Sequence, residues 1–406
     1  IFVLLIFLFG LVSRRVQRTI VTGPMVLTLA GILVVIALPE VARVELELKP
    51  VVLFSEVALA LVLFTDATRI KLRALMRASL PERLLAIGMP LTIVAGATVA
   101  VLLLSDLTVW EAAILATILA PTDAGLGQVV VNNPRIPARI RQALNIEAGL
   151  NDGISLPFLM LFVALAIADP GVGRFVWISY TLQQIGFGIL IGLATGWLGG
   201  WLLHHAARRS WMTETFQLLS LLCLALLAWG LAEHMGGNGF LAAFTGGIFV
   251  KVGFERASEH MIEFIEAWGQ LLSFAVFYLF GMLAAPDLGQ FSAVILLYAL
   301  LSLTLVRMAP VAVSLVGTGL KPASVLFLGW FGPRGLASVV LGLVYLKQKA
   351  HLPGEELIIL AIVATVLLSV FAHGISALPA SRRYVRQVEG METDAPELAA
   401  VGETAA

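Results

Sequence analysis

The sequence predicts an all-α, polytopic membrane protein with about 13 transmembrane helices. Hydrophobic residues make up 59% of the chain and charged residues 13%, whereas soluble domains carry about 25% charged residues. The apolar residues form long blocks, and a hydrocarbon core about 30 Å thick needs about 20 apolar residues per helix. A membrane β-barrel would instead show alternating segments of about ten residues. Helices are therefore favoured, because their backbone groups pair within each segment.

Thirteen intervals are apolar enough to be predicted as spans. They are residues 1–12, 20–38, 51–68, 84–104, 108–131, 139–168, 174–204, 214–232, 238–252, 262–284, 291–316, 321–346 and 355–378. A transmembrane domain over 1–378 thus precedes a tail, 379–406, which is basic at first and then acidic and rich in small residues. Such a composition buries little apolar surface, so we expect a disordered tail.

Basic residues gather in every second joint between spans. The joints after spans one, three, five and seven hold Arg14, Arg15, Arg18, Arg69, Lys71, Arg73, Arg77, Arg83, Arg135, Arg139, Arg141, Arg208 and Arg209. Cytoplasmic loops carry an excess of Lys and Arg, so the N-terminus is predicted outside the cell membrane. An odd number of spans then places the tail in the cytoplasm. The 26 basic and 26 acidic residues balance, which predicts no nucleic-acid partner.

Two of the predicted spans are interrupted by residues that break helices. The fifth contains Ala120-Pro121-Thr122-Asp123-Ala124-Gly125, and the twelfth contains Gly332-Pro333-Arg334-Gly335. Breaks at matching places in two halves point to a transporter's ion site. They predict inverted repeats over about 1–168 and 214–378, joined by a linker helix at 174–204. Two unrelated proline kinks are the alternative, disfavoured because each break also holds an ionisable residue.

The start of the sixth span carries ionisable and amide side chains inside apolar sequence. Glu147 and Asn151 are four residues apart and so share a helix face, and Asp152 is turned by about 100° from Asn151. Intramembrane charges are costly and are functional candidates by default. Asp152 is the predicted exchanging group, and a cap at a helix end is its alternative role.

Thr122 and Asp123 lie in the break of the fifth span. A broken helix frees carbonyl oxygens, and hard cations prefer oxygen ligands. We therefore expect Asp123 and Asp152 to bound one small pocket for a transported monovalent cation. A buried carboxylate favours its neutral form, so it can hold a proton or a cation but not both.

The remaining intramembrane charges have weaker interpretations. Arg334 is predicted to neutralise Glu147, with Asn151 in the same structural network. Asp66 contributes to the ion site or pairs with Arg69. Arg307, in the eleventh span, has no predicted partner. Other polar groups, among them Glu233, His234, His204 and His205, lie near joints and are interpreted as solvated.

Thr122-Asp123 in a broken fifth helix, Asn151-Asp152 in the sixth, residues 238–244 in the ninth and Gly332-Pro333-Arg334-Gly335 in the twelfth form a joint pattern. It resembles sodium/proton exchangers of the NhaP and NHE type, in the monovalent cation:proton antiporter family. The resemblance covers nearly the whole chain.

The resemblance implies an antiporter fold with crossed, interrupted helices, a moving core, alternating access, a homodimer and no cofactor. It makes Asp152 the cation- and proton-binding carboxylate, with Thr122 and Asp123 lining the site. It also matches Glu147 and Arg334 to a stabilising pair with Asn151 between them. Members with Asn-Asp here are generally electroneutral, which implies exchange of one cation for one proton.

Two positions depart from the family pattern. Ala148 replaces a Ser that often follows the Glu, and Thr65-Asp66 stands where a Glu often follows Leu-Phe. Either Asp66 supplies that oxygen ligand or the site has one ligand fewer, so Na⁺, K⁺ and Li⁺ all stay open.

Three other functions are alternatives to cation/proton exchange. A proton-coupled transporter of a small organic solute is disfavoured because the intramembrane polar residues are mostly carboxylates, Asn and Thr. An intramembrane enzyme would need a nucleophile with its base or metal ligands at helical spacing, and neither His-Glu-x-x-His nor Gly-x-Ser-x-Gly occurs. A channel would need a filter-like segment.

Overall fold

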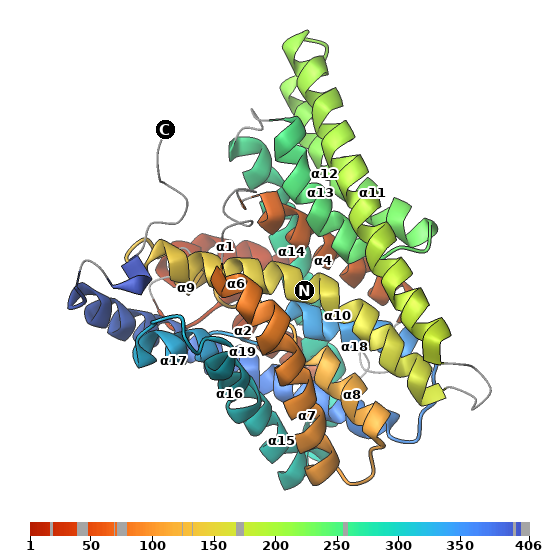
Figure 1. Cartoon of the computed structure of the whole chain (residues 1–406), viewed down its shortest axis with the longest axis vertical. Coiled ribbons are helices and arrows are strands. Elements are labelled where there is room, and N and C mark those ends of the chain that lie inside the picture. The colour runs from red at the N-terminus through yellow and green to blue at the C-terminus, as the bar shows by residue number, and fades with distance from the viewer. Residues whose placement is uncertain are drawn as a thin grey trace. The chain divides into compact units, whose positions relative to one another are not determined.

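The computed structural model describes residues 1–16, 19–38, 48–68, 70, 79–123, 125–131, 133–167, 174–254, 259–392 and 395–398. All the regular elements in these residues are helices (Figure 1). Eight are long and apolar enough to cross a membrane, and four more are apolar but shorter: Gly23–Ala37, Val109–Ile118, Gly239–Gly253 and Leu336–Lys347. The chain is a multi-pass membrane protein, as predicted.

Each predicted span has a helical counterpart in the described residues. The helices are α1 (Phe2–Val16), α2 (Gly23–Ala37), α4 (Leu48–Thr68), α6 (Ser79–Arg83), η1 (Leu84–Gly88), α7 (Met89–Leu103), α8 (Val109–Ile118), α9 (Gln128–Val131), α10 (Ala138–Ile167), α11 (Arg174–Arg208), α12 (Glu214–His234), α13 (Gly239–Gly253), α14 (Glu259–Ala284), η2 (Ala285–Gln290), α15 (Ala293–Leu303), α16 (Leu305–Ser314), α17 (Pro322–Trp330), α18 (Leu336–Lys347), α19 (Glu355–Glu389) and η3 (Pro396–Leu398). The count of thirteen spans is not confirmed, because the fifth, eleventh and twelfth intervals are each divided into two short helices.

The chain forms two compact units. The first consists of Ile1–Leu48, Ala78–Ala148 and Phe274–Ala406, and the second of Lys49–Arg77 and Gly149–Ser273. Two of the four boundaries fall inside α10 and α14, so each of these helices contributes residues to both units, and a third falls after the first residue of α4.

In the first unit, the last helix is longer than predicted. α19 continues to Glu389, although the sequence placed the end of the final span at 378. Its extra turns bury Tyr384, Val385 and Val388 in an apolar cluster, and the ring of Tyr384 stacks on Phe327 at 4.1 Å between centroids. The prediction of disorder from 379 is therefore wrong for the described part of the tail. Composition alone does not show that apolar residues stand at helical spacing among the arginines, or that they pack against other helices.

The second unit contains a close packing of α11 on α13. Gly188, Gly192, Gly196 and Gly200 recur every fourth residue on α11, and a methyl group on any of them would overlap the backbone of α13 or of its N-cap residue. Small residues let membrane helices approach in this way, where water supplies no hydrophobic driving force between them. Asn238 caps α13 by accepting from the N–H of Leu241 at 2.9 Å, and its amide nitrogen donates to the carbonyl of Gly153 on α10 at 3.2 Å.

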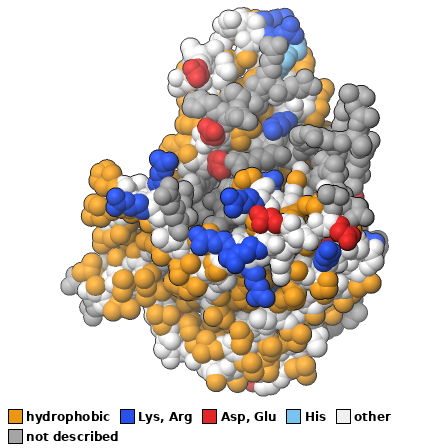
Figure 2. All heavy atoms as spheres, turned by 90° about the vertical axis from the view of Figure 1, so that its left-hand side faces the viewer, with side chains coloured by type: hydrophobic (Ala, Val, Ile, Leu, Met, Phe, Trp, Pro, Cys, Tyr) orange, Lys and Arg blue, Asp and Glu red, His pale blue; other side chains and the backbone are white. Residues whose placement is uncertain are grey.

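The surface carries many exposed apolar side chains, as expected of helices in lipid. Val3 and Phe7 on α1 are 78% and 63% exposed, and Leu102 on α7 is 74% exposed. Figure 2 shows hydrophobic side chains over much of one face and a group of Lys and Arg side chains gathered in one part of it.

Candidate functional site: the crossing of two helix breaks

The first break follows α8. This helix begins with a capping box, in which Thr108 and Glu111 satisfy each other's backbone N–H, and its regular bonding ends at Leu119. Residues 121–123 have no regular structure, and the short helix α9 starts only at Gln128. Pro121 has no N–H to continue the helix, which explains where α8 stops.

The second break separates α17 from α18. α17 ends at Trp330 and α18 starts at Leu336, with Gly332 and Pro333 between them. Both breaks belong to the first unit, and their backbones are directly hydrogen-bonded. The N–H of Asp123 donates to the carbonyl of Pro333 at 2.8 Å. The two discontinuous helices predicted from Pro and Gly are thus confirmed, and they cross at their breaks.

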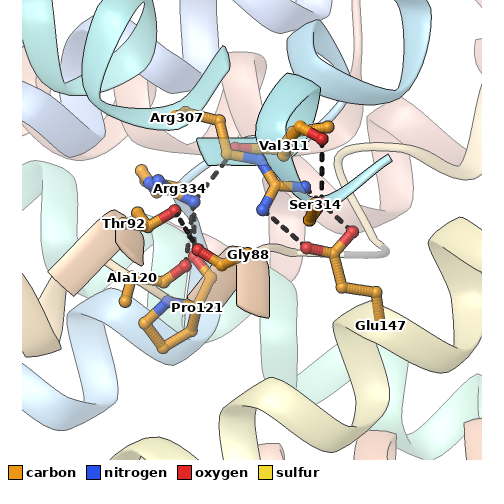
Figure 3. A network of polar contacts seen from close by, with 10 residues as sticks. Gly88, Thr92, Ala120, Pro121, Glu147, Arg307, Val311, Ser314 and Arg334 are labelled. Carbon is orange, nitrogen blue, oxygen red and sulfur yellow. Dashed lines mark hydrogen bonds and ion pairs between the residues drawn. The ribbon is translucent and has the colours of Figure 1, made fainter. Parts of the chain in front are cut away.

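Each break supplies a charged group to the helix end of the other. The N–H of Leu336, the first residue of α18, donates to Oδ2 of Asp123 at 2.7 Å, and the N–H of Gly125 donates to Oδ1 at 2.7 Å. In return, Nη1 of Arg334 donates to the carbonyls of Ala120 at 3.0 Å and Pro121 at 3.2 Å (Figure 3). A carboxylate at a helix N-terminus and a cation at a C-terminus both complement the helix dipole. Fixed charges therefore compensate the exposed backbone groups of both breaks.

Glu147 is paired with Arg307, not with Arg334. Nη1 and Nη2 of Arg307 donate to the two carboxylate oxygens at 2.5 and 2.9 Å, and both side chains are at least 98% buried. Figure 3 shows the two groups facing each other while Arg334 points toward Ala120 and Pro121. The predicted Glu147–Arg334 contact is wrong, because both oxygens of Glu147 are taken by a bidentate pair with Arg307 and Nη1 of Arg334 is bound to carbonyls.

Sequence reasoning left Arg307 without a role, although a signal was present. A lone arginine in an apolar span needs a counter-charge, but its partner Glu147 stands 160 positions earlier in the sequence. The helix also breaks locally at Thr304, whose φ and ψ are −108° and −93°. Arg307 lies just beyond this break, on α16, and its guanidinium lies so close to Gly332 that a methyl group there would overlap it.

A serine and a histidine of α19 also hold the second break, a role that no local sequence pattern indicates for either residue. The N–H of Arg334 donates to Oγ of Ser369 at 2.7 Å. His373 lies 2.9 Å from the carbonyl of Trp330 through Nε2, which must carry the proton because a carbonyl only accepts. Nδ1 of His373 lies 3.1 Å from Oγ of Ser369. The two ends of the break are thereby fixed to one turn of α19.

Of the other predicted site residues, Thr122 is buried in the first break, and the remaining three belong to the second unit. Asn151 and Asp152 are buried on α10, with 1% and 6% exposure, and Asp66 is half-buried on α4. Thr65, beside Asp66, donates its hydroxyl to the carbonyl of Leu61. Arg69, the alternative partner of Asp66, lies outside the described residues. That Asp123 and Asp152 share a pocket stays a prediction.

Most of the chain, including both breaks, falls within a match to a known protein family. The family described as "Sodium/hydrogen exchanger, transmembrane" matches residues 3–382. The chain belongs to this family. Its members are transmembrane exchangers and not enzymes. The solved structure of the sodium proton antiporter MjNhaP1 from Methanocaldococcus jannaschii at pH 8 has a TM-score of 0.75 at 19% identity, covering 92% of this chain and 97% of that one. The antiporter fold predicted from the sequence is thus confirmed.

Curated relatives match over shorter shares of their own length. The Na(+)/H(+) antiporter 2 of Zygosaccharomyces rouxii is 28% identical over 265 residues, which are 60% of this chain and 32% of that protein. The K(+)/H(+) antiporter NhaP2 of Shewanella sp. (strain ANA-3) is 26% identical over 335 residues, 81% of this chain and 57% of that protein. The chain thus spans about a third to just over half of these relatives.

Proposed function

We propose that this exchanger-family chain is a monovalent cation/proton antiporter that works by alternating access. The observation that carries the proposal is the crossing of two helix breaks, compensated by Asp123 and Arg334. Such crossings create exposed backbone dipoles at membrane depth, where a small ion can be held without its full hydration shell. The names of the two relatives, one a Na⁺/H⁺ and one a K⁺/H⁺ antiporter, support a monovalent cation and leave its identity open.

Asp152 is proposed as the carboxylate that binds a cation or a proton in competition. Its support is burial on α10, together with the sequence that follows it, which apart from Ser155 is apolar or Gly as far as Ile167. Thr122, Asp123 and Asp66 are proposed as further oxygen ligands of the cation. Asn151 in place of a second acid supports electroneutral exchange, because one exchanging carboxylate carries one charge in each direction. Glu147 and Arg334 are proposed to stabilise the site. Arg307 is added to them because its guanidinium forms the ion pair with Glu147.

The protein is proposed to act as a homodimer in the cell membrane with its N-terminus outside. The charge of the short loops supports the orientation: Arg135, Arg139 and Arg141 fall in one joint, whereas the joint 105–108 holds no basic residue. The described tail, with Arg382, Arg383 and Arg386, would then face the cytoplasm.

The test uses the purified chain in liposomes that contain a pH-sensitive dye and carry an imposed proton gradient. Sodium, potassium or lithium is added in turn to the wild type, to Asp152→Asn and to Asp106→Asn. Asp106 is an exposed loop carboxylate and so provides a matched control. We expect one cation to collapse the gradient with the wild type and the control but not with Asp152→Asn.

Two results would contradict the proposal. Failure of every cation to move protons through the wild type would reject antiport and turn attention to a proton-coupled organic solute. Full activity of Asp152→Asn would instead place the exchanging group elsewhere.

A further inference from the structure

The C-terminal segment, residues 395–398, returns to the first unit after α19 has ended. Its short helix η3 begins at Pro396, and the side chain of Glu397 within it is fully buried. Burying a carboxylate is costly unless it is hydrogen-bonded, so a buried Glu in so short a segment calls for a specific receptor.

That receptor is the first turn of α17. The N-cap residue of α17, Lys321, makes no capping bond through its own side chain. Its backbone N–H instead donates to Oε1 of Glu397 at 2.7 Å, and Oγ of Ser324 donates to the same oxygen at 2.8 Å. Because the only hydroxyl proton of Ser324 is used there, the hydroxyl of Tyr384, 2.9 Å away, must donate to Oγ of Ser324. Glu397 thus acts as the missing cap of α17.

A second contact attaches the same segment to another helix. Nη1 of Arg139, in the first turn of α10, donates to the carbonyl of Pro396 at 2.5 Å. The ring of Pro396 also faces Gly319, just before α17, where an added Cβ would lie 3.2 Å from its Cγ. The segment therefore bonds directly to the starts of α17 and α10, and Ser324 connects it to Tyr384 near the end of α19.

We propose that residues 395–398 form a latch that docks in cis on this surface and slows transport by restraining α17. The surface consists of Lys321, Ser324, Arg139 and Tyr384, and an acidic residue at 397 is what it recognises. The inference rests on the proposed antiport for its effect on rate, but not for the docking itself.

The link to transport is the short length of α17. Its nine residues span about 14 Å, and its other end leads into the break that contacts Asp123. Alternating access requires the crossing to change its surroundings, and a helix fixed at its start to α10 and α19 resists such a change. Losing one hydrogen bond to a charged group raises the population of the released state about tenfold or more.

A cysteine pair tests docking directly. In a Cys223→Ser background, Gly319→Cys with Pro396→Cys would place two Cβ atoms about 4.0 Å apart, within the range of about 3.5–4.5 Å that a disulfide spans. Gly319 has a φ of 76°, which strains a cysteine, so the single Gly319→Cys variant is the control for folding. We expect the pair to cross-link and the oxidised protein to exchange at least about tenfold more slowly than the same protein after reduction.

Release of the latch is tested by Glu397→Gln beside Glu389→Gln, an exposed acid at the end of α19. We expect Glu397→Gln alone to lower the cross-linking yield and, without the cysteines, to raise the exchange rate. Failure of the pair to cross-link would overturn docking. Cross-linking with unchanged exchange would overturn the effect on transport. If the cysteine pair cross-links but the wild-type chain exchanges no cation, the result supports docking and rejects antiport.

Discussion

Arg307 on α16 and Glu147 on α10 form a bidentate ion pair in which both terminal nitrogens of the arginine donate to the carboxylate. The pair lies beside the crossing, because Gly332 of the second break touches the guanidinium of Arg307. A buried pair of this kind is costly to desolvate, so its retention points to a positioning role more than to stability.

Breaking this pair from one side should be strongly destabilising. Arg307→Met or Glu147→Gln leaves a buried group without its partner, which costs about 3–5 kcal/mol. The double variant Glu147→Leu with Arg307→Met removes both charges and should recover most of the loss. Thermal unfolding in detergent, followed by tryptophan fluorescence, measures this.

Double-mutant cycles built from such variants distinguish the two arginines. The coupling energy between Glu147 and Arg307 should exceed that between Glu147 and Arg334, since only contacting residues couple strongly. An equal or larger coupling to Arg334 would restore the pairing expected from the sequence.

Gly335 should not tolerate a methyl group. An added Cβ there would overlap the carboxylate of Asp123 and lie 2.8 Å from a methyl of Leu126. We expect Gly335→Ala to abolish exchange in the liposome assay by pushing Asp123 off the start of α18. Gly342→Ala is the matched control, because its Cβ would meet only Ile362 at ordinary distances of 3.6 and 3.7 Å. In the middle of α18 this control should be neutral or stabilising by about 0.5–1 kcal/mol. Inactivity of both variants would indicate that α18 tolerates no change at all.

Removing the carboxylate of Asp123 should destabilise the crossing even without any ion. Asp123→Ala deprives the N–H groups of Leu336 and Gly125 of their acceptor, at about 1–3 kcal/mol for each buried group left unsatisfied. Asp123→Asn keeps one acceptor oxygen and should lose less. The unfolding temperature at several sodium concentrations separates this structural cost from lost ion binding. A wild-type unfolding temperature for Asp123→Ala in sodium-free buffer would refute the capping role.

Local sequence features predicted the helices and their breaks well. Apolar blocks of the right length define spans, and Pro121 and Pro333, each close to glycines, fall where helices end, whereas Pro157, Pro310 and Pro379 lie inside helices. The crossing itself could be expected only from the matching positions of the two breaks. The roles of Thr122, Asp66, Asn151 and Asp152 stay predictions.

Long-range pairing was the part that the sequence could not supply. Arg334 and Arg307 are both lone arginines in apolar helices, and nothing local states which one meets Glu147. Arg307, on α16 just after the irregular backbone of Thr304, is the one that pairs with Glu147, and this choice depends on packing between helices that are distant in the sequence. The buried Glu397 was missed for a related reason: its receptor is a backbone N–H and one hydroxyl group, which composition does not reveal.

The hold of the latch should weaken in acid. Burial raises the pKa of Glu397, but the hydrogen bonds from Lys321 and Ser324 and the charge of Lys321 outweigh it, so the pKa lies below its ordinary value of 4.5. A carboxylate whose folded pKa is lowered contributes stability above its unfolded pKa and loses it as pH falls through the folded pKa. Docking should therefore be constant from neutral pH down to about 5 and should weaken progressively below 4.5. A spin label on Leu398→Cys in the Cys223→Ser background reports this as a gain of mobility. Glu397→Gln should make the label mobile at every pH, whereas Glu389→Gln should leave the wild-type profile. A label that stays immobile in Glu397→Gln would show that the contacts of Pro396, and not the carboxylate, hold the segment.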